Sequence, residues 1–163
     1  MKYLSIICLV SLLIGCSKQE NKIQKDSEFL SRVFKDNNFW NAKSANGFYH
    51  SPDSMQFIVA YGENNERLTI AFKKDIERMG IQDFYSAKLI ESNCEHCASI
   101  KNAYSIDSTK INSFELMSYT TSTEPNRVGI RFSLNFKKDS LYTDHKPMQL
   151  LFDGILEVPI KNE

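Results

Sequence analysis

The residues best suited to chemistry are two cysteines and a histidine in the segment that begins at Glu91. Cys94 and Cys97 are separated by two residues, and His96 directly precedes the second cysteine. This spacing allows a disulfide bond, reversible thiol exchange, or one half of a metal site. Each of these needs a different structural context around the pair.

The surrounding sequence favours the disulfide bond. The arrangement resembles the Cys-x-His-Cys active site of some disulfide catalysts, which implies a βαβ context and a helix that begins at the first cysteine. Residues 98–121 instead predict a loop and then a strand. A common zinc site needs a second Cys-x-x-Cys pair, which the chain lacks. We therefore expect a structural disulfide between Cys94 and Cys97 and no cofactor, with redox or metal chemistry through Cys94, His96 and Cys97 as the alternative.

The rest of the sequence carries no recognisable catalytic motif. It contains no G-x-S-x-G, no H-E-x-x-H and no glycine-rich phosphate loop. The other two histidines of the mature chain, His50 and His145, lie in turn-like segments. Six aromatic residues could line a sugar-binding face, although filling the core is the interpretation we favour: Trp40, Tyr49, Tyr61, Tyr85, Tyr104 and Tyr119. The sequence therefore predicts a protein that is not an enzyme.

The charge balance argues against a nucleic-acid partner. Lysine plus arginine number 20, aspartate plus glutamate number 20, and the net charge is zero. A chain of this kind has no overall positive field that would attract a polyanion.

The first 16 residues form a targeting segment. Lys2 supplies the positive charge and Leu4–Leu13 the apolar stretch of a secretory signal. This stretch is shorter than the roughly 20 apolar residues that a membrane-spanning helix needs.

The end of this segment resembles the lipobox of bacterial lipoproteins in the run Leu13-Ile14-Gly15-Cys16. The resemblance implies a signal peptide over residues 1–15, cleavage before Cys16, and acyl chains such as palmitate on that cysteine. Two or three acyl chains give lasting attachment to a membrane. Ser17 follows the cysteine, and in this class a serine there, unlike an aspartate, is compatible with the outer membrane. We expect residues 16–26 to form a polar, lipidated tether to the cell envelope.

Alternating apolar residues predict strands through most of the remaining domain, residues 27–163. The clearest pattern is Arg127–Phe136, in which every second residue is apolar. Strands are also expected at 55–61, 67–72, 85–91, 111–121 and 148–160, with a hairpin turn at 62–66 and a bulge or bend at Asp153-Gly154. The sequence predicts an all-β fold, mainly an antiparallel β-sandwich or barrel-like sheet.

Two short helices are expected in addition. Residues 27–36 place Phe29, Leu30, Val33 and Phe34 on one helical stripe, which predicts a short N-terminal amphipathic helix. Residues 74–79 could form one helical turn.

Several short runs resemble a group of uncharacterised β-sandwich lipoproteins of the Bacteroidota. The runs are Phe39-Trp40-Asn41-Ala42, Gly129-Ile130-Arg131-Phe132 and Phe152-Asp153-Gly154-Ile155. The group implies no activity, and this chain departs from it at residues 92–104, which contain the cysteine pair. We expect a lipid-anchored protein with a binding or structural role, whose partner is an envelope protein or a glycan.

Overall fold

The computed structural model describes residues 24–25, 29–73, 80–81, 84–94, 98–120, 126–142 and 146–161. The strands are β1 Gln24–Lys25, β2 Leu30–Lys35, β3 Asn38–Phe39, β4 Ala42–His50, β5 Met55–Gly62, β6 Glu66–Lys73, β7 Gly80–Ile81, β8 Phe84–Ser92, β9 Ile100–Ile106, β10 Ser113–Thr120, β11 Arg127–Lys138 and β12 Gln149–Lys161. Two single-turn 3₁₀ helices, η1 Ser51–Asp53 and η2 Glu63–Asn65, connect β4 to β5 and β5 to β6. The predicted all-β class is confirmed.

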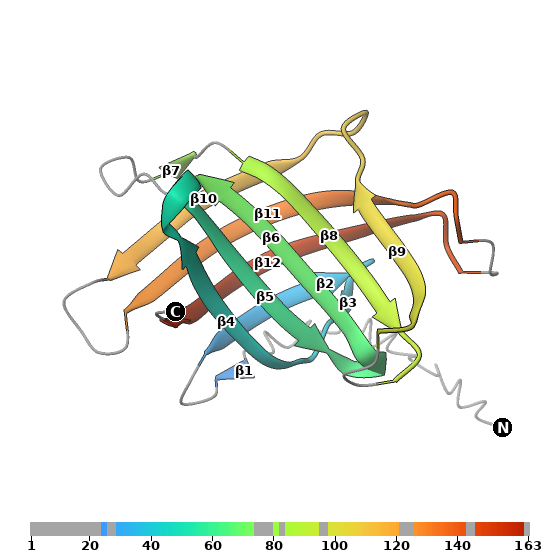
Figure 1. The fold of residues 1–163 in the computed structure, drawn as a ribbon, viewed down its shortest axis with the longest axis horizontal. Helices are drawn as coiled ribbons and strands as arrows, with labels where there is room; N and C mark the ends of the chain where they lie inside the picture. Colours follow the sequence, from blue (N-terminus) through green and yellow to red (C-terminus); the bar gives the residue numbers. More distant parts are fainter. Residues whose placement is uncertain are drawn as a thin grey trace, which may run out of the picture.

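The strands form two layers that belong to one continuous sheet. One layer has the order β4-β5-β6-β8-β9 and the other β2-β12-β11-β10, and the strands of the two layers cross in Figure 1. The layers are joined at two corners, where β12 pairs with β4 in parallel and β11 pairs with β9 in antiparallel orientation. The long β11–β12 hairpin lies in one layer and reaches both corners, so it closes the sheet upon itself.

The core lies between the layers and is built from alternate residues of the strands. In β11 the five predicted inward residues are all buried, whereas Arg131 is exposed: Val128, Ile130, Phe132, Leu134 and Phe136. Aromatic rings fill the centre, where Phe152 contacts both Trp40 and Phe136 edge to face. A shift of β11 by one residue would expose these five side chains, so burial fixes its register.

The predicted N-terminal helix is wrong for the residues that the structure describes. Leu30–Lys35 is strand β2, which pairs with β12 from Phe152 to Glu157. The spacing of Val33 and Phe34 fits a helical stripe, but β12 offers a free edge whose hydrogen bonds extend the sheet, and this tertiary pairing overrides the local pattern. Residues 27 and 28 and the possible helix at 74–79 lie outside the described residues.

Gly154 permits a close approach of strands and does not produce the predicted bulge. Pairing of β12 with both neighbours continues through Gly154 without a change of register. The backbone φ of Gly154 is +150°, and a Cβ built there would lie 2.1 Å from the carbonyl oxygen of Arg32. Only glycine fits such a position.

The expected strands at β5, β6, β8, β10, β11 and β12 are confirmed, whereas β4 and β9 were not expected from the sequence. Among the described residues, no helix has the length and apolar character needed to cross a membrane.

Candidate functional site

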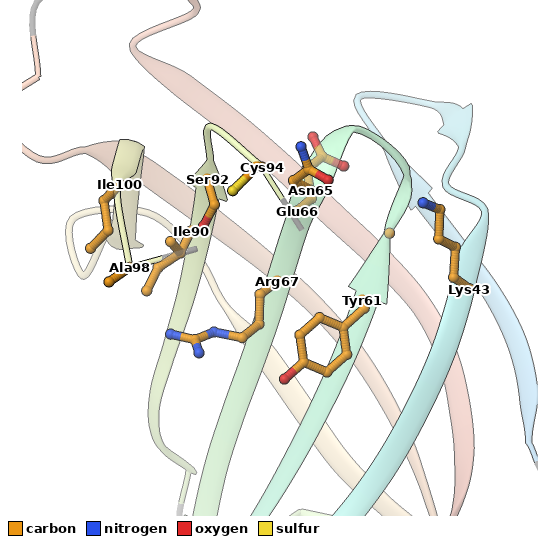
Figure 2. A pocket seen from close by; sticks show the side chains of 11 residues that line it. Lys43, Tyr61, Asn65, Glu66, Arg67, Ile90, Ser92, Cys94, Ala98 and Ile100 are labelled. Atoms are coloured by element: carbon orange, nitrogen blue, oxygen red, sulfur yellow. The ribbon is translucent and has the colours of Figure 1, made fainter. Parts of the chain in front are cut away.

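A hollow on the outer face of the first layer is the candidate binding site, and we call it the outer groove. It lies over the ends of β5, β6 and β8 and has a volume of about 420 Å³. Its floor is a row of three direct cross-strand neighbours, Tyr61, Arg67 and Ile90. Lys43 on β4 and Ile100 on β9 stand at its two sides (Figure 2).

The alternation of β6 places opposite charges on opposite faces of the sheet. Glu66 and Leu68 point inward and are buried, while Arg67 between them points into the outer groove. Gly62 forms part of the groove wall, and a Cβ on Gly62 would lie only 2.4 Å from the ring of Trp40. The groove and the core are therefore separated by the thickness of a single sheet.

The outer groove combines unpaired positive charge with exposed apolar surface. Neither Arg67 nor Lys43 forms an ion pair with any residue in the described ranges. Tyr61 is 41% exposed and Ile100 is 43% exposed, although both are large and apolar. An exposed cation beside apolar side chains is typical of a site for an anion that also has an apolar part.

Behind the groove, a layer of polar side chains closes one end of the core, and we call it the polar layer. Glu66 is 5% exposed, and its carboxylate accepts hydrogen bonds from Lys35 Nζ at 2.5 Å and from Trp40 Nε1 at 2.6 Å. Both donors come from the N-terminal part of the chain, so the carboxylate ties β6 to β2 and to the start of β4. A buried carboxylate without such partners would be strongly unfavourable.

Glu91 is the second carboxylate of the polar layer and is the direct cross-strand neighbour of Glu66. It is 2% exposed and accepts hydrogen bonds from Lys146 Nζ at 2.8 Å and Asn102 Nδ2 at 3.0 Å, with Lys35 Nζ 3.6 Å away. Burial by itself raises the pKa of Glu91, but the hydrogen bonds from Lys146 and Asn102 outweigh it and hold the pKa below its ordinary value. Glu91 is therefore ionised at neutral pH and a poor general acid.

Tyr104 lies beneath the polar layer and is fully buried. Burial raises the pKa of its phenol to about 12, and the negative charges of Glu91 and Glu66 add to the effect. Its hydroxyl oxygen forms no hydrogen bond with the described part of the chain. The phenol is consequently neutral. The arrangement of the polar layer fits a structural role at the end of the core better than a set of reacting groups.

The cysteine of the predicted site that the structure describes lies at the rim of the outer groove. Cys94 is exposed and sits in a bend directly after β8, and neither Asn93 before it nor Ala98 beyond it is helical. Cys16, His96 and Cys97 lie outside the described residues, so the lipidation and the Cys94–Cys97 bond stay predictions. Cys94 is the one cysteine in the described ranges, and no group of three metal-ligating side chains is found there.

His50 lies at a turn, as expected. Its Nδ1 is 2.8 Å from Asp53 Oδ1 across η1, and both side chains are about half exposed. This hydrogen bond lowers the pKa of Asp53. His145 is outside the described residues.

The six aromatic residues do not share one face. Trp40 and Tyr104 are in the core, Tyr49 is half-buried and Tyr61 is on the outside; the side chains of Tyr85 and Tyr119 are not described. Filling the core is thus the correct interpretation for Trp40 and Tyr104, while Tyr61 is available to a ligand.

Sequence reasoning missed the residues that matter most in the outer groove and in the polar layer. Arg67 in the groove and the paired Glu66 and Glu91 were not singled out. The alternation of the strands could have revealed the two carboxylates. Glu66 lies two residues from Leu68, and Glu91 lies two residues from Leu89, so each carboxylate falls on the inward face of an apolar strand. Charged residues at inward positions need partners and therefore mark a specific arrangement.

No protein-family model matches the chain, and no curated protein or solved structure shows significant similarity to it.

Proposed function

We propose that this protein is exported, anchored to the outer membrane through lipid on Cys16, and serves there as a binding module without enzymatic activity. The anchor rests on the order of residues in the first 16 positions, where Lys2, the apolar stretch and the Leu13-Ile14-Gly15-Cys16 run occur in the sequence typical of lipoproteins. The outer groove supplies a surface for the binding role.

One observation carries the binding role more than any other. Arg67 is a solvent-facing cation without an ion-pair partner among the described residues, and it lies between the exposed side chain of Tyr61 and the half-buried side chain of Ile90. The polar layer supports a role without catalysis, because the carboxylates of Glu66 and Glu91 are already held by lysines.

The alternative is a thiol-redox or metal-binding protein that acts through Cys94, His96 and Cys97. The position of Cys94 at the rim of the outer groove, exposed to solvent, keeps this alternative open. Intact mass before and after mild reduction separates the two. A mass lower than that of the dithiol by two hydrogen atoms, stable to mild reductant, supports a structural bond, whereas retained metal, or a bond that opens at a mild potential, favours the alternative.

The anchor is tested by growing cells with an alkyne analogue of palmitate and separating their membranes. We expect the wild-type protein to carry the label and to sediment with the outer membrane, and Cys16→Ser to lose both properties. Cys94→Ser serves as the matched control, since it removes a thiol of the mature chain and should leave labelling unchanged. Undiminished labelling of Cys16→Ser would contradict the proposal.

A further inference from the structure

We infer that the outer groove binds a free fatty acid of medium chain length, with the carboxylate on Arg67 and the alkyl chain along the outer face of β5. This inference deepens the binding role proposed above by naming the class of ligand. Three properties support it: the chemistry of the cation in the groove, the length of the apolar surface that continues from the groove along β5, and the position of the groove on the outside of a filled core.

The cation of the groove suits a carboxylate. Guanidinium groups bind carboxylates with two parallel hydrogen bonds, and such charge-assisted bonds are about twice as strong as neutral ones. Arg67 is placed for this purpose, because its side chain runs over the floor of the groove between Tyr61 and Ile90 (Figure 2). Lys43 adds a second positive charge at the β4 side of the groove.

The apolar surface is long enough for an alkyl chain. Tyr61 lines the groove, and the half-buried Val59 and Phe57 continue from it beyond the groove as alternate residues of β5 that point to the same, outer face. At about 3.3 Å per residue, this stretch of strand spans about 13 Å. Ile90 and Ile100 add apolar surface within the groove, next to Arg67.

Other kinds of ligand fit the same surface less well. A neutral apolar molecule would take Arg67 out of water without giving it a partner, which is unfavourable. A cation would be repelled by Arg67 and Lys43. An apolar ligand in the interior is also disfavoured, because the aromatic rings of Trp40, Phe136 and Phe152 pack together there.

The test is photo-crosslinking of the full chain in a non-ionic detergent with a diazirine-bearing analogue of decanoic acid. Mass spectrometry of the digested protein then locates the label, so partition of the probe into detergent does not obscure the site. We expect label on the peptides that contain Tyr61 or Ile100, suppressed by excess decanoate. Arg67→Gln should lower this labelling at least tenfold. Lys73→Gln, which removes one exposed charge from the other end of β6, is the matched control and should leave it unchanged.

Several outcomes would overturn the inference. The first is equal labelling by the corresponding decanol analogue, because this would mean that the carboxylate is not recognised. The second is label away from both the groove and the outer face of β5, or labelling of Arg67→Gln at the wild-type level. The third is suppression by dodecyl phosphate but not by decanoate, which would assign the groove to a phosphate ligand. None of these results depends on Cys16, so they leave the test of the membrane anchor intact.

Discussion

Lys35 allows the strongest test of the polar layer, since it is the only cation within 4 Å of both buried carboxylates among the described residues. Its ammonium group lies 2.5 Å from Glu66 and 3.6 Å from Glu91. Replacing Lys35 by Met keeps the length and the apolar contacts of the stem but removes the charge. Among the described residues, Glu66 then keeps only the Trp40 indole as a donor, and Glu91 keeps Lys146 and Asn102.

The expected cost of Lys35→Met follows from the burial of the charges that remain. Removing one partner of a buried ion pair costs about 3–5 kcal/mol. Because the Lys35 side chain is 22% exposed, we expect the lower end of that range, about 3 kcal/mol at pH 7. Lys43→Met removes a similar charge from an exposed position of β4 and should cost less than about 0.5 kcal/mol.

The pH dependence gives the deeper test. Lys35 is one of the charges that lower the folded-state pKa of Glu91, so this pKa should lie higher in Lys35→Met than in the wild type. A carboxylate with a lowered folded-state pKa loses its stabilising contribution as it is protonated, so the deficit of Lys35→Met should shrink as the pH falls below 4.5, the unfolded value of Glu91. Glu66→Gln in the same background should recover part of the stability, because the amide oxygen can still accept the Trp40 hydrogen bond.

Urea unfolding at pH 7 and below pH 4.5, followed by circular dichroism, measures these free energies of unfolding. The slope of the free energy against urea concentration should match that of the wild type, which shows that the same surface is exposed on unfolding. A cost below about 0.5 kcal/mol, or one that does not depend on pH, would refute the view that Lys35 compensates two buried charges.

Three further predictions use the same unfolding assay. Gly154→Ala should destabilise the fold by about 3 kcal/mol, because its positive φ and the carbonyl oxygen of Arg32 both exclude a Cβ. Gly47→Ala is the control and should cost less than half as much, because the atoms nearest to the added Cβ are 3.3 Å away. Tyr104→Phe should be neutral or stabilising by about 1 kcal/mol, because the buried hydroxyl has no hydrogen-bond partner in the described ranges, and a cost above about 1 kcal/mol would mean that the hydroxyl has a partner after all. The wild type should lose stability as the pH falls below 4.5, the unfolded pKa of Glu91, because the pKa of this group is lowered in the folded state. Glu91→Gln should be less stable than the wild type at neutral pH, but it should not show the part of the acid destabilisation that comes from protonation of Glu91.

The sequence alone was enough to predict the strands in which apolar and polar residues alternate regularly. In β11 and in β6, alternate apolar residues decide which face is buried, and both strands were predicted correctly. In β5 the alternation was read in the wrong phase, because the strand buries Ile58 and Ala60 and turns the larger Tyr61 outward. The alternation also determines that Arg67 faces away from the core, because its neighbours Glu66 and Leu68 are of the opposite phase. These are local properties, since the side-chain directions of a strand depend only on its own residues.

The tertiary structure decided the remaining elements and both candidate sites. The residues of β2 have an ambiguous period, and they are a strand because β12 pairs with them more than 110 positions along the chain. Glu66 and Glu91 are neighbours only through the register of β6 with β8, and Lys35 meets them only because the sheet closes upon itself. Likewise, Tyr61 and Ile90 flank Arg67 through pairings between three strands. A sequence pattern states which way a side chain points, but the partner across the strand is set by the free energy of burying the whole core in one register.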